Sequence, residues 1–224
     1  FSLITSCADY IVMGEGEETI IELIKAIKNR ETFQKIEGIG YNLNNQVVIN
    51  NRRNRRQSID KISYPDWDSF NVKGYYENRF VGGMYSDKLT IPILATRGCP
   101  YQCTYCSAPN MWLPLWIPRD PILVVDEIEY YVKKFGAGNF PFQDLTAIIK
   151  RDWIKAFCEE LIKRKLNINW QLPTGTRSEA IDSEIAFLIK KSGMISMAYA
   201  PESGSEETRK YIKKKMKTDR LFDL

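Results

Sequence analysis

LTIPILATRGCPYQCTYC, residues 89–106, joins an apolar, strand-like run to three closely spaced cysteines, Cys99, Cys103 and Cys106. Three thiolates on one loop are one ligand short of completing a tetrahedral metal site or of binding every iron of a cubane cluster. A structural metal site closes its coordination sphere, whereas a catalytic site keeps one position open for substrate or solvent. The C-x3-C-x2-C spacing therefore predicts a site with one open position, and the chain has no histidine that could fill it.

The strand-then-helix pattern repeats after the cysteines. Strand-like runs start near Asn139 (NFPFQD), Asn167 (NINWQLP) and Met194 (MISMAYA), about 28 residues apart, and a helical pattern follows each of them. Alternating strands and helices predict parallel strands with helices outside them, and this spacing is typical of a (β/α) barrel. We therefore predict an α/β fold, a partial TIM-like barrel that contains its first four βα units.

Capping signals place helices between these strands. Asp120 and Pro121 suit the N-cap and the first helical position, and Gly136 suits the end of the same helix. Apolar residues at helical spacing predict two further helices, and Ser205 opens a fourth. The residues that mark the first three helices are Val125, Ile128, Val132 and Phe135, then Trp153, Phe157 and Leu161, then Ile185, Leu188 and Ile189.

Polar residues follow each predicted strand. The cysteine loop follows the first strand, Asp144 the second, Arg177 the third, and Glu202 and Ser203 the fourth. A parallel barrel carries its reactive loops at the carboxyl ends of its strands, so these side chains are expected on one rim. We therefore predict an active-site rim there, with scattered loop polarity as the alternative.

The beginning of the chain has a strand, a glycine-rich turn and a helix. Residues 8–13 (ADYIVM) are strand-like, and Gly14 and Gly16 lie in the turn that follows. Such a unit is typical of the last piece of a doubly wound domain. The apolar residues that recur with helical spacing after the turn are Ile20, Leu23, Ile24 and Ile27.

Between this unit and the barrel, two strand-like runs flank Asn44 and Asn45, which is a hairpin signal. An irregular stretch with several aromatic residues follows. We divide the chain into residues 1–35, the end of a doubly wound domain, residues 36–88, a linker with a β-hairpin, and residues 89–224, the truncated barrel.

Composition excludes several kinds of site. Without histidine the chain alone cannot form a Ser-His-Asp triad, a Cys-His pair or an imidazole-bound zinc site. Five cysteines, an odd number, cannot all be paired in disulfides, and their clustering is typical of a reducing compartment. The sequence has no apolar run of roughly 18 residues. We therefore expect a soluble, cytoplasmic protein.

The net charge of +4 is modest, and much of it lies in residues 52–56 (RRNRR) and 213–215 (KKK). Clustered cations could bind nucleic acid or another anion. No stacking aromatic residues are interleaved with these cations, so a solvated turn and a helix end are the favoured interpretation. RNA binding is the alternative.

With the cysteine loop at the end of the first strand of a βα repeat, the chain resembles the radical S-adenosylmethionine (SAM) enzymes, whose hallmark is C-x3-C-x2-C. The match includes an aromatic residue, Tyr105, just before the last cysteine. Residues 9–17 resemble the end of the cobalamin-binding domain that precedes the barrel in one large subgroup. Residues 142–145, 175–180 and 200–205 resemble the same subgroup, whose nearest branch includes anaerobic magnesium-porphyrin cyclases and P-methylases.

The resemblance implies that Cys99, Cys103 and Cys106 hold three irons of a [4Fe-4S] cluster and that SAM chelates the fourth iron. It implies reductive cleavage of SAM to a 5′-deoxyadenosyl radical, for cobalamin-assisted methyl transfer or oxidative cyclisation on an unknown small molecule. Cobalamin is the further cofactor implied, and an external electron donor such as flavodoxin or ferredoxin is the partner implied. A membrane span is not expected and nucleic acid is not the favoured ligand.

Roles for the rim residues also come from the resemblance, and each has a plainer alternative. Tyr105 would lie beside the adenine, or simply pack in the loop. Asp144 would lie near the methionine moiety or the substrate, or cap a helix. Arg177 would meet a carboxylate, or form a surface salt bridge. Glu202 and Ser203 would contact the ribose or the amino acid part of SAM, or belong to a helix cap.

Two points stay open in the sequence. Gly14 and Gly16 would border the nucleotide tail of cobalamin, although glycines in a strand–helix turn need no ligand. The family's barrel has six strands and this chain starts at Phe1, so we expect a piece of a longer enzyme. The rival interpretations are an iron–sulfur or zinc binding module without catalysis, which needs a fourth protein ligand, and a radical SAM enzyme that modifies tRNA.

Overall fold

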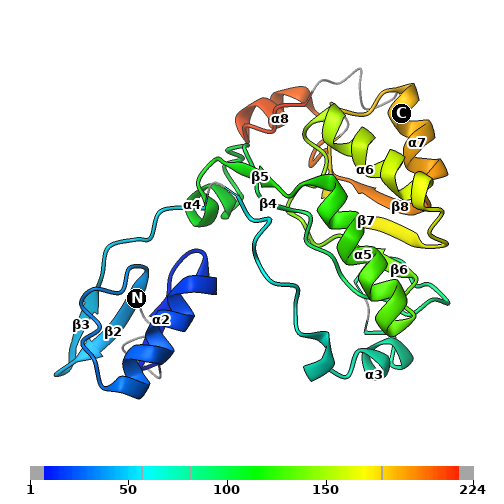
Figure 1. Ribbon diagram of the computed structural model, residues 1–224. Helices are drawn as coiled ribbons and strands as arrows, with labels where there is room; N and C mark the ends of the chain where they lie inside the picture. The colour runs from blue at the N-terminus through cyan, green and yellow to red at the C-terminus, as the bar shows by residue number, and fades with distance from the viewer. Residues whose placement is uncertain (1–7, 57, 81, 178, 217–224) are drawn as a thin grey trace. The chain divides into compact units, whose positions relative to one another are not determined.

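The computed structural model describes residues 8–56, 58–80, 82–177 and 179–216 (Figure 1). The chain divides into two compact units, Phe1–Gln57 and Ser58–Leu224, and each is described by itself. None of the helices in the described residues combines the length and the apolar composition needed to cross a membrane.

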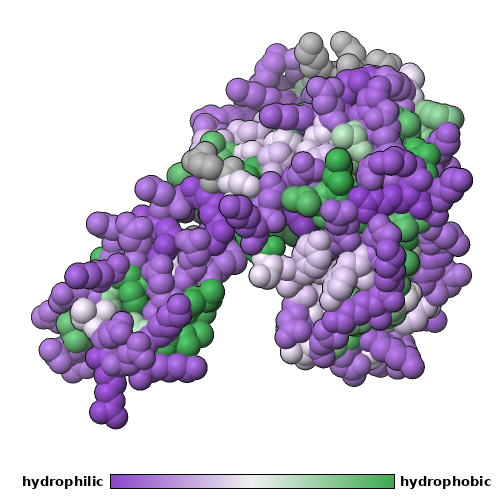
Figure 2. Space-filling view, in the orientation of Figure 1, coloured by the Kyte–Doolittle hydropathy of each residue, from purple (hydrophilic) through white to green (hydrophobic). Residues whose placement is uncertain are grey.

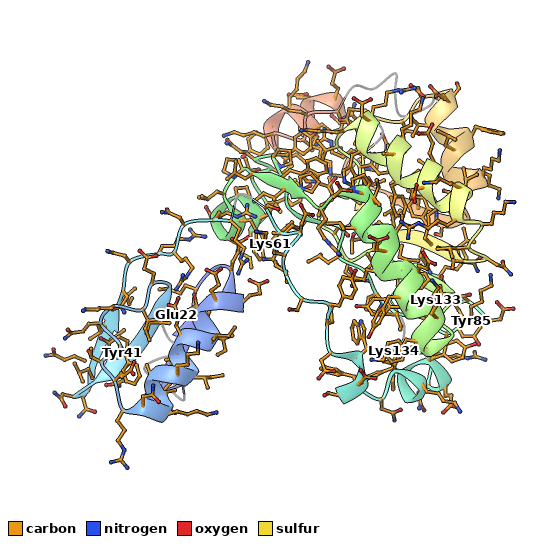
Figure 3. The ribbon with its side chains drawn as sticks, in the orientation of Figure 1. Glu22, Tyr41, Lys61, Tyr85, Lys133 and Lys134 are labelled. Carbon is orange, nitrogen blue, oxygen red and sulfur yellow. The ribbon has the colours of Figure 1, made fainter. Side chains whose placement is uncertain are left out.

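The first unit is a three-stranded antiparallel sheet with one helix. The strands are β1 (Tyr10–Val12), β2 (Ile39–Leu43) and β3 (Gln46–Ile49), in the order β1-β2-β3, and the helix is α2 (Gly16–Asn29). Figure 3 labels one residue from each layer, Glu22 on α2 and Tyr41 on β2. The small core of this unit is formed by Leu23, Ala26, Ile36, Ile39 and Tyr41.

The predicted hairpin is present, but it belongs to the first unit rather than to a linker. Asn44 and Asn45 both have positive φ, 51° and 62°, as a two-residue type I′ turn requires. Strand β2 then pairs with β1, where Ile11 lies opposite Gly40. Because the hairpin completes this sheet, the division of the chain falls near residue 57 and not at residue 35.

Helix α2 forms as predicted, but its buried side differs from the expected apolar face. Leu23 is 3% exposed, whereas Ile20, Ile24 and Ile27 are 42%, 44% and 45% exposed. The buried side of the helix consists of Thr19, Leu23 and Ala26, which is a narrower stripe than the hydrophobic pattern suggests. Figure 2 shows hydrophobic side chains on the first unit where α2 lies.

The basic run at residues 52–56 contacts the acidic start of α2. Arg53 and Arg56 pair with Glu18 at 3.4 and 2.9 Å, and the buried side chain of Arg55 pairs with Glu15 at 3.5 Å. Because these guanidinium groups are engaged within the unit, the run acts as a structural contact between the hairpin segment and the helix.

The second unit contains the predicted βα repeat. Strands β6 (Asn139–Pro141), β7 (Asn169–Thr176) and β8 (Met194–Tyr199) form a parallel sheet in that order. The helices that alternate with them are α5 (Pro121–Phe135), α6 (Arg151–Arg164), α7 (Ser183–Lys191) and α8 (Glu206–Tyr211). In Figure 1, α5, α6 and α7 lie along this sheet, and their apolar faces form the main core with it. The partial barrel is therefore confirmed.

The first predicted strand, residues 89–97, is not continuous. Thr90 and Ile93 form only isolated parallel bridges, to Asn139 in β6 and to Phe142 just after it. The chain then forms β4 (Thr96–Gly98), which pairs antiparallel with β5 (Trp116–Pro118). The Ile91 and Ile93 N–H groups still donate to the Asn139 and Pro141 carbonyls at 3.0 Å each, whereas Pro141 has no N–H to donate to the Ile91 carbonyl, so the ladder to β6 lacks a hydrogen bond there. The short helix α4 (Ala108–Trp112) follows the cysteines.

Helix termini match the capping signals. The Asp120 side chain accepts a hydrogen bond from the Ile122 N–H at 2.8 Å, and Gly136 adopts φ 67° at the end of α5. Ser205 caps α8 by accepting from the Thr208 N–H at 3.2 Å.

The segment from residue 58 to 88 packs against the barrel helix α5. It contains a turn of 3-10 helix, η1 (Trp67–Ser69), and the helix α3 (Val72–Glu77). Tyr64 contacts Tyr131 with ring centroids 6.0 Å apart, and Lys134 pairs with Asp68. Figure 3 labels Lys133, Lys134 and Tyr85 in this region. These contacts anchor the segment to the second unit.

Candidate functional site

The cysteine loop starts where β4 ends, and Gly98 turns the chain there with φ 87°. Cys99 is half-buried, Cys103 is buried and Cys106 is exposed, and none of them forms a disulfide. The Cys106 N–H donates to the Cys103 carbonyl at 3.1 Å, which closes a tight turn between the last two cysteines. Its sulfur accepts from the Ala108 N–H at 3.4 Å, at the start of α4.

The donor set fits a cluster, but the sulfur atoms are not gathered around one. In the ranges that the structure describes, no three Cys, Asp or Glu side chains lie close enough together to hold a metal ion. Burial raises the pKa of the Cys99 thiol, and the neighbouring Cys103 and Cys106 raise it further. Three free thiols on one loop match the ligands of an iron–sulfur cluster with one open iron. Binding must therefore deprotonate these thiols.

Asp144, at the end of β6, holds the strand that leads into the cysteine loop. Its side chain is 1% exposed, and its two carboxylate oxygens accept the N–H groups of Ala95, at 3.2 Å, and of Thr96. Burial raises its pKa to about 6, against the opposing effect of these hydrogen bonds. Thr174 on β7 donates to the Asp144 carbonyl at 2.5 Å. The carboxylate therefore fixes the backbone of Ala95 and Thr96, which leads into the cysteine loop.

Arg177, after β7, contacts the middle of the cysteine loop. Its guanidinium Cζ lies 3.6 Å from the ring centroid of Tyr101, which stands between the first two cysteines. Its Nη2 donates to Glu179 at 2.6 Å and its Nε donates to the same carboxylate at 3.0 Å, so the ion pair is fork-shaped. Arg177 is 5% exposed. The salt bridge considered as the alternative is therefore present, and it joins a buried guanidinium to a Glu179 side chain that is 38% exposed.

Glu202, after β8, contacts the last part of the loop. It adopts φ 66° and pairs with Lys214 at 3.0 Å, and Lys214 is itself buried. This pairing is the main cause that lowers the pKa of Glu202. Burial raises the pKa of Tyr105, and a hydrogen bond to Glu202 raises it further. Glu202 therefore links Tyr105 to the segment after α8.

That segment also bonds directly to the loop. The Thr104 N–H donates to the Ile212 carbonyl at 3.0 Å, and the Cys103 thiol donates to the Lys213 carbonyl at 3.9 Å. Residues that follow β6, β7 and β8 thus contact the cysteine loop or the backbone that leads into it, as expected at the rim of a barrel.

The remaining predicted residues lie in local turns. The Ser203 hydroxyl accepts from the Ser205 N–H at 3.1 Å, and its carbonyl accepts from Arg209, so it belongs to the cap of α8. Gly14 adopts φ 85° in the turn before α2, and Gly16 is the first residue of that helix. The predicted contacts of these residues and of the rim residues with cofactors stay predictions.

Three contributors were not singled out from the sequence. Tyr101 lies inside the cysteine motif, Glu179 lies two residues after Arg177, and Lys214 lies in the basic run 213–215. Lys214 follows the carboxyl end of α8, whereas the carboxyl ends of the strands face the amino ends of the helices that follow, so topology gave no signal for it. A lysine in a charged run gave no sign of burial.

Comparison with known proteins shows the family of the chain. A model of the radical SAM superfamily matches residues 93–224, more than half of the chain. The anaerobic magnesium-protoporphyrin IX monomethyl ester cyclase of Cereibacter sphaeroides is 33% identical over 204 residues, which are 88% of this chain and 32% of that protein. The chain spans between 32% and 40% of the length of the three cyclases it matches.

Two solved structures share the fold. The cobalamin-dependent SAM radical enzyme OxsB, with aqua-cobalamin and SAM bound, has a TM-score of 0.71 at 20% identity, over 94% of this chain and 30% of that chain. The radical SAM methyltransferase TsrM of Kitasatospora setae, with tryptophan and a SAM analogue bound, has a TM-score of 0.68 at 19% identity, over 90% and 39%.

Proposed function

The chain belongs to the radical SAM superfamily, and we propose that it is the part of an enzyme that holds a [4Fe-4S] cluster and cleaves SAM reductively. The observation that carries this proposal is the C-x3-C-x2-C loop, which leaves one iron without a protein ligand and is held at the barrel rim. Cys99, Cys103 and Cys106 would hold the cluster. When bound, it supplies the single electron that breaks a C–S bond of the SAM sulfonium, releasing methionine and a 5′-deoxyadenosyl radical.

The chain's own residues position the loop and prepare its ligands. Asp144 fixes the backbone before Cys99, and Arg177 holds the ring of Tyr101. The positive charge of Arg177 lowers the pKa of Cys99, opposing the larger effect of burial. Because thiolates are the ligands, this charge favours the form of Cys99 that binds iron.

We further propose cobalamin-assisted methyl transfer or oxidative cyclisation as the reaction class, on a small-molecule substrate. Residues 9–17 support a cobalamin site in the full enzyme, with Gly14 and Gly16 beside its nucleotide tail, because they resemble the end of a cobalamin-binding domain. The cyclase similarity supports cyclisation, and the methyltransferase fold supports methyl transfer. We place the enzyme in the cytoplasm, with an external electron donor.

The tRNA-modifying alternative has less support. It relied on the arginines of residues 52–56, and Arg53, Arg55 and Arg56 pair with acidic residues of α2. A non-catalytic metal module would need a fourth protein ligand beside the three cysteines, and the chain has no histidine to supply one.

Anaerobic reconstitution with iron and sulfide tests the proposal. We expect one [4Fe-4S] cluster per chain, whose reduced electron paramagnetic resonance signal changes when SAM is added, because SAM binds the open iron. Bound zinc, or a reduced signal that is indifferent to SAM, would contradict the proposed function.

A further inference from the structure

Two lysines beside the cysteine loop carry charge that no carboxylate neutralises within the described residues. Lys213 and Lys215 are both exposed and form no ion pair there. Their neighbours behave differently, because Lys210 pairs with Glu206 at 2.8 Å and Lys214 pairs with Glu202. The two free charges therefore point to a role outside the packing of this unit.

Both lysines line hollows that open beside the loop. The larger hollow, of about 690 Å³, is lined by Tyr101, Glu179, α8 and the segment after it. The smaller one, of about 230 Å³, is lined by Pro100, Tyr101 and Gln102 together with the two lysines. Lys213 and Lys215 line both of them. Pro100 to Gln102 is the stretch between Cys99 and Cys103, so the two charges face the backbone that carries the first two proposed cluster ligands.

The lysine segment also touches a cysteine directly. The carbonyl of Lys213 accepts a hydrogen bond from the Cys103 thiol at 3.9 Å. A macromolecule that docks on Lys213 and Lys215 is therefore brought next to a cluster ligand. An electron carrier needs this proximity, because the rate of electron transfer falls steeply with distance.

The positive charge of this surface favours a partner whose own surface is acidic. The larger hollow is lined by five cations and two carboxylates, which leaves a net charge of +3. Tyr211, which follows the lining residue Lys210 in the chain, is 83% exposed, and the surface around α8 is coloured mainly as hydrophilic in Figure 2. The cations are Arg209, Lys210, Lys213, Lys214 and Lys215, and the carboxylates are Glu179 and Glu206. Positive surfaces with an exposed aromatic residue fit partners of complementary charge.

We propose that Lys210, Tyr211, Lys213 and Lys215 form a docking surface, here called the lysine surface, for an acidic one-electron carrier protein. The proposal rests on the proposed function, which needs one electron from outside the chain for each SAM cleaved. The carrier is oxidised by one electron and the cluster is reduced by one electron. No covalent bond forms or breaks in this step. Small, charge-steered contacts of this kind are typical of transient redox complexes.

The test compares two charge reversals in the reconstituted protein. The first is the double variant Lys213→Glu/Lys215→Glu. The matched control is Lys190→Glu/Lys191→Glu, which reverses two exposed lysines in the last turn of α7. This turn precedes β8 and so lies at the amino end of the sheet, away from the rim. Stopped-flow spectroscopy follows cluster reduction by a reduced flavodoxin with an acidic surface, and by photoreduced 5-deazariboflavin, a small uncharged reductant.

With flavodoxin at low ionic strength, we expect the rate constant to fall roughly 10-fold in Lys213→Glu/Lys215→Glu and to stay near wild type in the control. Added salt should slow the wild type toward the variant, because screening removes the attraction. With 5-deazariboflavin all three proteins should react alike. Equal flavodoxin rates for the two variants would overturn the lysine surface, as would a loss that appears with both reductants. A wild-type protein that 5-deazariboflavin cannot reduce would instead refute the proposed function, and the docking surface with it.

Discussion

The guanidinium of Arg177 lies over the ring of Tyr101, with Cζ 3.6 Å from the ring centroid, and Glu179 holds the same guanidinium from its edge. This pair joins the residue after β7 to the middle of the cysteine loop. A cation over an aromatic face contributes about 0.5 to 2 kcal/mol, more when water is excluded. Because Arg177 is buried, the contact lies in the upper part of that range and restrains the loop between Cys99 and Cys103.

Replacing the ring of Tyr101 should weaken the hold on the cluster. Tyr101→Leu removes the aromatic face, and we expect the reconstituted cluster to lose iron to a chelator roughly 10-fold faster, as about 1.4 kcal/mol of restraint is lost. Tyr101→Phe keeps the face and should behave like wild type. The measurement is the rate of iron release by absorbance. Equal rates for the two variants would show that the stacking has no part in holding the loop.

A second variant of this contact separates charge from shape. Arg177→Lys keeps the positive charge but loses the planar fork that binds Glu179. It should therefore release iron nearly as fast as Tyr101→Leu.

Loss of one cysteine should abolish SAM cleavage. In Cys103→Ala two thiolates remain, and they cannot retain a cluster with an open iron. The assay is 5′-deoxyadenosine formation under reducing, anaerobic conditions, together with the iron content. Cys158→Ala is the matched control, because Cys158 is buried in α6 and burial raises its pKa to about 12. The control should lose a little stability and keep its iron. Full 5′-deoxyadenosine formation by Cys103→Ala would refute the assignment of the cluster ligands.

Sequence patterns predicted the positions of the rim residues better than their partners. Topology alone brought Asp144, Arg177 and Glu202 to one rim, since residues at the carboxyl ends of parallel strands meet there. The patterns do not encode which atoms these side chains reach. Arg177 binds Glu179 and Tyr101, and neither contact has a signature in spacing or hydropathy.

Elsewhere the predictions failed where local and tertiary effects compete. The apolar run at residues 89–97 suggested one strand, but Pro141 on the partner strand has no N–H to complete the ladder, and Thr96 pairs with β5 instead. The pattern of α2 suggested a wide apolar face, whereas the small sheet of the first unit covers only the stripe around Leu23 and Ala26. The hydrophobic pattern shows that one face of a helix is apolar. It does not show how much of that face the rest of the fold covers.

The link between Glu202 and Lys214 should contribute measurably to the stability of the second unit. Lys214 is 9% exposed and the Glu202 side chain is 34% exposed, so solvent screens the pair in part. We expect a coupling of about 1 kcal/mol in a double-mutant cycle of Glu202→Gln and Lys214→Met, measured by denaturant unfolding. The same cycle for the exposed pair Lys210 and Glu206 should give about half as much. Additive effects of the Glu202 and Lys214 variants would exclude the link.

Because burial raises the pKa of Asp144 to about 6, we expect the stability of the folded protein to depend on pH. The folded protein binds a proton at this carboxyl more tightly than the unfolded chain, whose carboxyl has the ordinary value near 3.8. Stability therefore falls as pH rises between these two values, and the loss is complete above the folded pKa. A difference of about 2 pKa units corresponds to about 3 kcal/mol.

Asp144→Asn isolates this effect, because all other titrating groups cancel in the comparison with wild type. At pH 4 the variant should be less stable than wild type, since the amide offers one acceptor to the two N–H groups of Ala95 and Thr96. Its disadvantage should shrink by about 2.4 kcal/mol between pH 4 and pH 7, because only the wild type has to ionise a buried carboxyl over that range. Urea unfolding at several pH values measures this difference. A stability gap that stays constant over that range would show that Asp144 ionises with an ordinary pKa, and that its burial is compensated by the backbone of the loop.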